Sequence, residues 1–434
     1  MHSSAAARPH ARRTEIAWAF YDWANSAFAV TVLTAFFPLM LKRYWGEGAD
    51  ATVTTFQLGL ANALGSIAIA VLAPALGAIA DQSGSRKRYL LIFTVLAIGT
   101  TASLAFVPRG AWQWAAAMYV LASIGFSGAA SFYDALLVNV TDKSNYHRVS
   151  ALGYALGYLG GGLLFAVNVA MTLQPQWFGL PDAITAVRAS FATVAIWWAI
   201  FTIPLLVWVG EPVAKASGSR WQLAVAGMRQ LVETFHEIRR LRQLMLFLAA
   251  YWLYIDGVGT IAHMAIDYGL ALGFDESNLI LALLMTQFIA FPAAIVYGRI
   301  GMRIGPKRAI GAGIVIYTLA TIWGHSMRTT TEFYVLAAII GLVQGGVQSL
   351  SRSLYAQLIP TSRSAEFFGF YNMLGKFAAI LGPLLMGFAA VLTGSSRAAI
   401  LGVVVLFAAG ALLLLFVDEN AGARVARELD ATGK

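Results

Sequence analysis

Hydrophobic residues form long runs along most of the chain, separated by short polar or basic segments. A helix needs about 20 mainly apolar residues to cross a bilayer, so runs of this length predict transmembrane helices. We expect twelve spans, at about residues 16–41, 53–80, 89–107, 112–140, 149–172, 187–210, 243–272, 278–301, 309–327, 333–359, 366–393 and 397–417. The predicted fold class is an all-α membrane protein.

Composition supports this prediction and excludes several other classes. Of the 434 residues, 59% are hydrophobic and only 12% are charged, against roughly 25% charged in soluble domains. Cysteine is absent, which excludes disulfides and thiolate metal sites. The sequence also has no phosphate-binding GxxxxGK[ST] loop, no metal-ligand spacing and no GxSxG nucleophile motif. We therefore expect no enzyme activity, no cofactor and no metal.

Basic residues are distributed unequally between the two sides of the predicted membrane. The side that carries both termini has 22 Lys and Arg residues, and the opposite side has six. Cytoplasmic loops carry such an excess, so we expect both termini in the cytoplasm and a multi-pass protein of the cell (inner) membrane. The net charge of +9 then reflects loop topology and not nucleic-acid binding. The expected partners are the lipid bilayer and a small-molecule substrate, and a monomer is expected.

Two loops at an offset of 221 residues resemble each other. "GAIADQSGSRKR" begins at Gly77 and "GRIGMRIGPKR" begins at Gly298, so Gly84 aligns with Gly305. Such a repeat predicts two six-span halves, as in secondary transporters. The expected organisation is a cytoplasmic tail (1–15), a first half (16–210), a linker (211–242), a second half (243–417) and a second tail (418–434).

These loops carry a family resemblance. The Gly-x-x-x-Asp-x-x-Gly-x-Arg-Lys pattern in the first loop is similar to the signature of the major facilitator superfamily, although Gln82 stands where the family usually has Arg. The resemblance implies two pseudo-symmetric six-helix bundles. It also implies a gating role for Asp81 and Arg86, as a latch that stabilises one of two access states. The alternative is that Arg86 and its basic neighbours only determine topology.

A narrower resemblance rests on four blocks spread over both halves. "YDWANSAF" (21–28), "SALGYALGYLGGG" (150–162), "QGGVQSLSRSLYAQLIP" (344–360) and "AEFFGFYNMLGKFAAILGPL" (365–384) are similar to the vacuole-effluxer family. That family is named for a fungal vacuolar amino-acid exporter. The resemblance therefore implies a transporter, and an amino acid is the substrate it suggests.

The linker has its own pattern. From Trp221, apolar residues recur at helical spacing through Val225, Met228 and Val232, among basic residues. This pattern predicts an amphipathic helix at the cytoplasmic membrane surface. A solvated linker helix is the alternative.

Ionisable and amide side chains recur within the predicted spans, although a charge at the centre of a span is costly. Polar stripes at helical spacing fall on spans 1, 4, 7, 10 and 11, so each must face protein or a water-filled cavity. The candidate substrate-binding residues are Asp22, Asn25, Tyr133, Asp134, Trp252, Asp256, Gln344, Gln348, Arg352, Asn372 and Lys376. Asp22, Asp134 and Asp256 are the candidates for proton coupling.

Arg352 admits two functions. At about 1.5 Å per residue, Asp22, Asp134 and Arg352 all lie roughly 10 Å inside the cytoplasmic boundary. In the first of these functions, Arg352 pairs with Asp22 or Asp134 across the halves and gates the cytoplasmic side. In the second, Arg352 or Lys376 grips a substrate carboxylate while an aspartate binds an ammonium or a proton. Two structural alternatives stay open as well: Asp22 could cap its helix locally, and Gln344 and Gln348 could join helices.

Together these observations predict a secondary active transporter that moves a small polar solute by alternating access, coupled to protons. The expected solute is an amino acid or a related zwitterion or anion. Export of a larger amphiphilic or drug-like compound is an alternative. A polytopic membrane enzyme or receptor is a further alternative, which the duplicated loop disfavours.

Overall fold

The computed structural model describes residues 4–48, 51–211, 220–237, 241–377, 381–393 and 400–432. Within these ranges the regular structure is helical and contains no strand, so the all-α prediction is confirmed. The helices of the first half are α1 (Ser4–Ala27), η1 (Phe28–Phe36), α2 (Phe37–Met40), η2 (Leu41–Trp45), α3 (Ala51–Ser83), α4 (Arg86–Leu104), α5 (Trp112–Val140), α6 (Tyr146–Leu173) and α7 (Ala183–Trp208).

The second half follows a linker helix and repeats the six-span arrangement. Its helices, with that linker first, are α8 (Arg220–Glu237), α9 (Arg242–Ala271), α10 (Glu276–Ile304), α11 (Pro306–Ser326), α12 (Thr330–Leu358), α13 (Ser364–Phe377), α14 (Leu381–Thr393), α16 (Gly402–Leu415) and α17 (Glu419–Thr432). Ten helices of the described ranges are long and apolar enough to cross a membrane. The pair α13 and α14, and then α16, occupy the predicted positions of spans 11 and 12.

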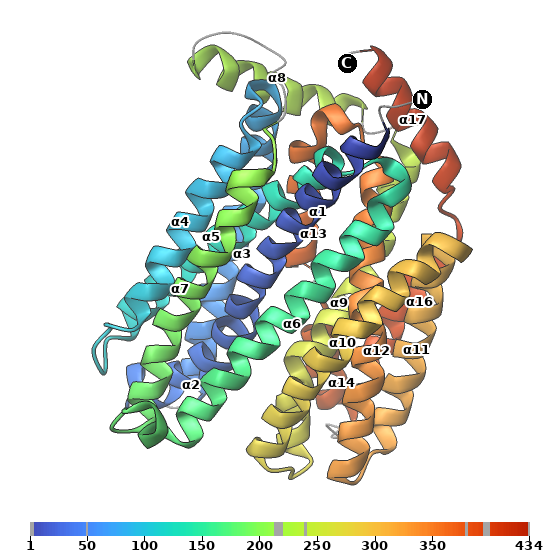
Figure 1. The fold of residues 1–434 in the computed structure, drawn as a ribbon. Coiled ribbons are helices and arrows are strands. Elements are labelled where there is room, and N and C mark those ends of the chain that lie inside the picture. Colours follow the sequence, from blue (N-terminus) through green and yellow to red (C-terminus); the bar gives the residue numbers. More distant parts are fainter. Residues whose placement is uncertain are drawn as a thin grey trace.

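Figure 1 shows the spans as two tilted groups, with α1 to α7 in one and α9 to α12, α14 and α16 in the other, and α13 lies between them against α3. The first turns of α1, the linker helix α8 and the last helix α17 all lie at the same end of the molecule. We call this the terminal end. The basic excess predicted for one side of the membrane belongs to this end.

The first span is not a regular α-helix. Over η1 and η2 it winds as a π-helix, in which each backbone N–H bonds to the carbonyl five residues earlier. The Phe37 N–H bonds to the Val32 carbonyl in this way, and the Gly46 N–H bonds to the Leu41 carbonyl at 2.9 Å. Such widened turns are frequent at functional sites. Val30 and Thr34 of η1 line the central cavity described below.

The two halves share an arrangement of lysine hydrogen bonds that supports the predicted duplication. The Lys87 ammonium and the Lys307 ammonium each donate to two carbonyls at the end of the last span of their half, at 2.6–2.9 Å. Their backbone N–H groups donate to Glu211 and Glu419, respectively. Lys87 is therefore equivalent to Lys307, an offset of 220. The offset of 221, which aligns Arg86-Lys87 with Lys307-Arg308, is wrong here because the second loop is one residue shorter.

Helices α3 and α13 cross closely at the terminal end, and they join the halves. A methyl group on Gly77 would lie 2.3 Å from the carbonyl oxygen of Ala365, so only glycine allows this approach. The linker helix α8 packs on the same crossing, with Gly227 against Ile79. The apolar residues predicted to lie on one face of α8, Trp221, Val225, Met228 and Val232, are 45–78% exposed. The side of α8 that meets the bundle is polar instead.

The last helix also holds the terminal end together. The Asp430 carboxylate of α17 accepts hydrogen bonds from the Thr361 N–H and hydroxyl and from the Ser362 N–H, at 2.9–3.1 Å. Burial raises the pKa of this carboxyl, but these donors outweigh burial and hold the pKa below its ordinary value. The carboxylate thus fixes α17 to the loop between α12 and α13.

Candidate functional site

A cavity of about 490 Å³ lies between the two halves and is lined by residues of α1, α5, α6, α9, α10, α12 and α13, among others. Its lining reaches Leu279 and Phe333, in the first turns of α10 and α12, so the cavity extends toward the end opposite the terminal end. Its polar side chains include Asp22, Asn25, Ser127, Tyr133, Asp134, Tyr158, Gln344, Gln348, Arg352 and Asn372. Its other walls are mainly apolar.

An ion cluster forms the floor of the cavity. The Arg352 guanidinium of α12 lies 3.2 Å from the Asp22 carboxylate of α1 and 3.0 Å from the Asp134 carboxylate of α5. It also donates to the hydroxyl and the carbonyl of Ser150 on α6, both at 2.9 Å. One basic residue of the second half is thereby fixed to three helices of the first half.

The hydrogen-bonding capacity of Arg352 is used up by these contacts. A guanidinium has five N–H donors, and five donor–acceptor contacts are present: two to Asp22, one to Asp134 and two to Ser150. The side chain is only 1% exposed. No donor is left over for a substrate carboxylate in this conformation. The arrangement therefore favours the first function predicted for Arg352, the pairing across the halves.

Aromatic rings and a glycine complete the cluster. The guanidinium carbon lies 4.3 Å from the ring centre of Tyr154 and 4.8 Å from that of Trp18, close enough for cation–π attraction. The Tyr133 hydroxyl donates to Asp22 at 2.8 Å. A methyl group on Gly153 would lie 2.7 Å from the Asp22 carboxylate and 2.9 Å from the guanidinium. Glycine at this position is thus required for the cluster to close.

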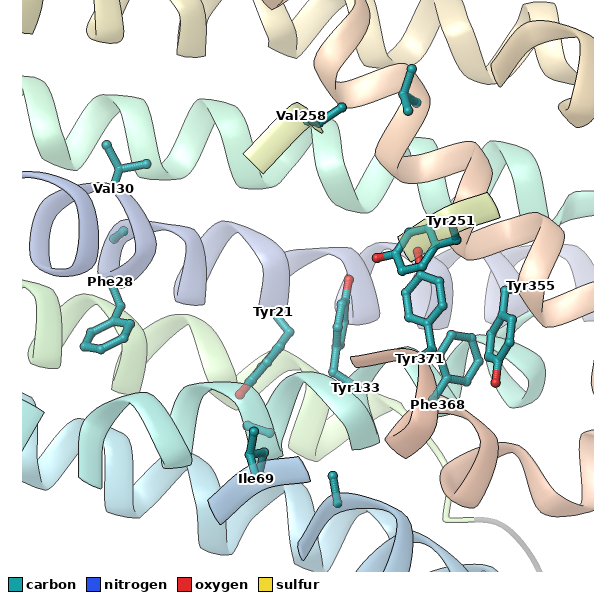
Figure 2. Packing of buried hydrophobic residues seen from close by; sticks show 14 of the residues in the cluster. Tyr21, Phe28, Val30, Ile69, Tyr133, Tyr251, Val258, Tyr355, Phe368 and Tyr371 are labelled. Carbon is teal, nitrogen blue, oxygen red and sulfur yellow. The ribbon is translucent and has the colours of Figure 1, made fainter. Parts of the chain in front are cut away.

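Tyrosines pack on the terminal side of the ion cluster. Figure 2 shows Tyr251, Tyr355, Phe368 and Tyr371 gathered together. Their ring centres are 4.2 Å apart for Tyr251 and Tyr371 and 4.8 Å apart for Tyr355 and Tyr371. Asn372, the next residue of α13, donates to Asp134 at 3.0 Å. Aromatic packing and the ion cluster together separate the cavity from the terminal end.

A second polar layer joins the halves at the terminal end. Asp81 of α3 pairs with Arg86 at 2.6 Å and accepts the backbone N–H groups of Ala365 and Glu366, in the first turn of α13, at 3.1 and 2.9 Å. Carboxylates are favourable at helix N-termini because the N–H groups there lack partners. Arg86 also donates across the halves to the Thr361 carbonyl, at 3.3 Å.

The linker helix takes part in this layer. Gln230 of α8 donates to the buried Glu366 carboxylate at 2.5 Å, and the Thr234 hydroxyl donates to the same group. Arg363 pairs with Glu366 at 3.2 Å, and Gln82 of α3 donates to Gln230. We call these contacts, with those of Asp81 and Arg86, the terminal latch. The residue in the place of the expected arginine, Gln82, thus contacts the linker helix.

Eight of the predicted substrate-binding residues come together in the cavity: Asp22, Asn25, Tyr133, Asp134, Gln344, Gln348, Arg352 and Asn372. Gln348 also accepts a hydrogen bond from Tyr158 across the halves, at 2.7 Å. The side chain of Lys376 lies outside the described residues. The structure therefore gathers polar side chains of α1, α5 and α12 with Asn372 of α13, while Asp256 of α9 is not among the lining residues.

Asp256 and Trp252 do not line the cavity. The Asp256 carboxylate accepts the backbone N–H groups of Leu381 and Gly382, at the start of α14, at 3.0 and 2.9 Å, and also the Thr260 hydroxyl. It therefore caps the backbone N–H groups of the first described residues of α14. Neither residue joins the polar side chains of the cavity, and the substrate-binding roles expected for Asp256 and Trp252 and the proton-coupling role expected for Asp256 stay predictions.

Sequence reasoning missed Ser150, Tyr154 and Trp18 as parts of the ion cluster, and Glu366 as part of the terminal latch. Ser150 and Tyr154 lie four residues apart on α6, on either side of Gly153. That spacing places them on one helix face.

The fold and the cavity define a membrane transporter of the major facilitator type. The human organic anion transporter MFSD10 (TETRAN) superposes with a TM-score of 0.71 at 16% identity, over 93% of this chain and 99% of that one. The transporter FucP in its outward conformation superposes with a TM-score of 0.69 at 13% identity, over 94% and 98%. The predicted fold of twelve spans in two pseudo-symmetric halves is thereby confirmed.

The chain belongs to the family described as "Vacuole effluxer Atg22 like", whose profile matches residues 10–143 and 138–427. It is 40% identical over 418 residues to the "Uncharacterized MFS-type transporter YxiO" of Bacillus subtilis, covering 96% of this chain and 97% of that protein. It is 26% identical to "Autophagy-related protein 22" of Yarrowia lipolytica, covering 71% of this chain and 56% of that protein. The chain is a multi-pass secondary transporter and not an enzyme.

Proposed function

We propose that this transporter carries a small polar solute, an amino acid or a related zwitterion or anion, by alternating access coupled to protons. The observation that carries the proposal is the ion cluster, in which Arg352 of one half joins Asp22 and Asp134 of the other at the cavity floor. Since every donor of Arg352 is engaged there, the cluster holds the two halves together at the cavity floor. In the proposal it acts as a gate, which we call the inner gate.

The terminal latch acts as a second gate. Asp81 and Arg86 connect α3 and α4 to the first turn of α13, and these contacts must break if the halves separate at this end. With the termini placed in the cytoplasm by the basic excess, the described conformation is closed toward the cytoplasm. The cavity then extends toward the outside.

Proton coupling is assigned to Asp22 and Asp134. In the ion cluster one guanidinium faces two carboxylates, and a proton would relieve the surplus negative charge. Protonation of either carboxylate weakens its pairing with Arg352, which links proton binding to opening of the inner gate. Asp256 is not included, because backbone N–H groups satisfy it away from the cavity.

The substrate proposal rests on the composition of the cavity. Amides from both halves, Asn25, Gln344 and Gln348, lie beside the ion cluster and offer both donors and acceptors. A zwitterion can use such groups together with a carboxylate freed from Arg352. The working unit proposed is a monomer, because one chain supplies both faces of the cavity.

Export of a larger amphiphile is the second candidate, and one observation favours it. Away from the floor, the wall of the cavity is apolar, with residues such as Phe126, Ile255, Leu283 and Ile340. A bulky apolar group would fit there. The family description, which names an effluxer, is compatible with both candidates.

Uptake into proteoliposomes tests the proposal. We expect labelled amino acids to accumulate without chemical change when a pH gradient is imposed, and a protonophore to abolish the accumulation. Arg352→Ala and Arg352→Lys should both abolish accumulation, since neither side chain can hold Asp22, Asp134 and Ser150 together. Full transport by both variants would remove the ion cluster from the mechanism. Transport only of amphiphilic compounds would favour the second candidate.

A further inference from the structure

A second hollow, of about 550 Å³, lies apart from the central cavity, where α1 and α7 run side by side. It is formed by Arg12, Arg13, Ile16, Phe20, Pro204 and Trp208, and we call it the α1–α7 groove. Ile16 and Trp208 are 37% and 41% exposed, so the groove opens to the surroundings of the bundle. It shares no lining residue with the cavity.

The wall of the α1–α7 groove nearer the terminal end is positively charged, because Arg12 and Arg13 form it. Both arginines are exposed, and neither makes an ion pair within the part of the chain that the structure describes. Arg13 is held in place by Trp208, whose ring centre lies 4.2 Å from the guanidinium carbon. The neighbouring acid, Glu15, does not compensate them. It is 5% exposed and pairs with Arg148 at 2.6 Å on another side of α1.

The part of the groove farther from the terminal end is apolar and continues into the membrane-facing surface. Ile16 begins the apolar run of the first span, and Phe20 lies one turn below it. On α7, Ile196, Ile200 and Ile203 continue from the groove and are 53–60% exposed. Tryptophan and arginine are typical at the level of lipid headgroups. The groove therefore presents charge at headgroup depth and apolar surface at acyl-chain depth.

We propose that the α1–α7 groove binds one phospholipid with an anionic headgroup, from the leaflet at the terminal end. The lipid phosphate accepts hydrogen bonds from Arg12 and Arg13, because guanidinium groups pair with phosphate through two parallel donors. An acyl chain lies along Ile16, Phe20 and the exposed isoleucines of α7. This site is independent of the proposed substrate and of the ion cluster.

Native mass spectrometry of the purified full-length protein tests the site, with phosphatidylglycerol and phosphatidylethanolamine as probes. Arg12→Ala/Arg13→Ala should weaken phosphatidylglycerol binding about thirtyfold, since each basic residue near an anionic lipid surface contributes roughly 1 kcal/mol. Phosphatidylethanolamine carries the same phosphate, but its ammonium group is repelled by the two arginines. It should therefore bind the unmodified protein more weakly than phosphatidylglycerol and lose less affinity in this variant. Arg12→Lys/Arg13→Lys, which keeps the charge and loses the paired donors, should give an intermediate loss.

The matched control is Arg299→Ala/Arg303→Ala, which removes the same charge from exposed positions near the end of α10. We expect it to leave phosphatidylglycerol binding within about twofold of the unmodified protein, since neither residue lines the α1–α7 groove. An equal loss in both double variants would show general electrostatic attraction and overturn the site. No loss in Arg12→Ala/Arg13→Ala would overturn it too. Competition by inorganic phosphate alone would show an anion site that needs no lipid, and would also contradict the proposal.

Discussion

Arg352 joins the two halves through five hydrogen bonds, two to Asp22, one to Asp134 and two to Ser150. Its charge is buried at 1% exposure, and it is compensated only because Asp22, Asp134 and Ser150 surround it. Buried ion pairs add little net stability by themselves, but breaking one leaves an uncompensated charge. Substitutions here should therefore have large effects.

Replacing Arg352 by Ala leaves Asp22 and Asp134 facing each other without a cation. We expect the free energy of unfolding to fall by about 3–5 kcal/mol, measured by denaturation in detergent. Adding Asp22→Asn and Asp134→Asn to Arg352→Ala should restore part of that loss, because the unpaired carboxylates are gone. A single variant as stable as the unmodified protein would contradict the described geometry.

Gly153→Ala tests how tightly the ion cluster is closed. Its methyl group would meet the Asp22 carboxylate and the Arg352 guanidinium at under 3 Å, so the cluster must shift. We expect a loss of roughly 1–3 kcal/mol in unfolding free energy, together with reduced transport. Gly99→Ala is the matched control: a methyl group there meets nothing within 4 Å. It should be neutral or stabilising, since alanine favours helix. Equal effects of the two changes would refute the close approach.

At the scale of elements, the linker helix α8 connects the two halves at the terminal end. Helix α8 contacts the bundle through Gln230 and Thr234, which both donate to Glu366 of α13. Because α3 and α13 belong to different halves, this position lets α8 stabilise the closed terminal end. The chain has no cysteine, so single introduced cysteines can report on this end without background.

Glu366→Ala should loosen α8 and the terminal latch together, since it removes the acceptor for Gln230, Thr234 and Arg363. We expect a cysteine placed at buried Thr234 in this background to react faster with a water-soluble maleimide than in Thr234→Cys alone. The comparison controls for the loss of the Thr234 hydroxyl itself. Unchanged reaction rates would show that Glu366 does not hold α8.

The variant Asp256→Asn tests whether Asp256 caps a helix or couples transport to protons. It weakens a cap on Leu381 and Gly382, so we expect a loss of about 1 kcal/mol in unfolding free energy. The dependence of transport on the pH gradient should stay as in the unmodified protein. If that dependence disappeared while the fold remained, Asp256 would belong to the proton pathway after all.

At the scale of the whole molecule, the spans and the pairing of charges were predictable. Both follow from the free energy of placing apolar and charged residues in a membrane. Apolar length defines each span, and the penalty for an isolated charge indicated that Asp22, Asp134 and Arg352 lie together. The contribution of Ser150 was not predictable, since it arises from the contact of α6 with α12 across the halves. The cap made by Asp256 depends on the Leu381 and Gly382 N–H groups inside span 11 being available to a side chain, which hydropathy does not reveal.

Alternating access is the central claim, and distances between paired spin labels test it most directly. One pair at exposed Arg88 and Arg308 reports on the terminal end, and another at Gln176 and Thr331 reports on the opposite end. In Arg352→Ala we predict longer distances for the first pair and shorter distances for the second, relative to the otherwise unmodified protein. Unchanged distances at both ends, or changes in the same direction at both, would contradict the account.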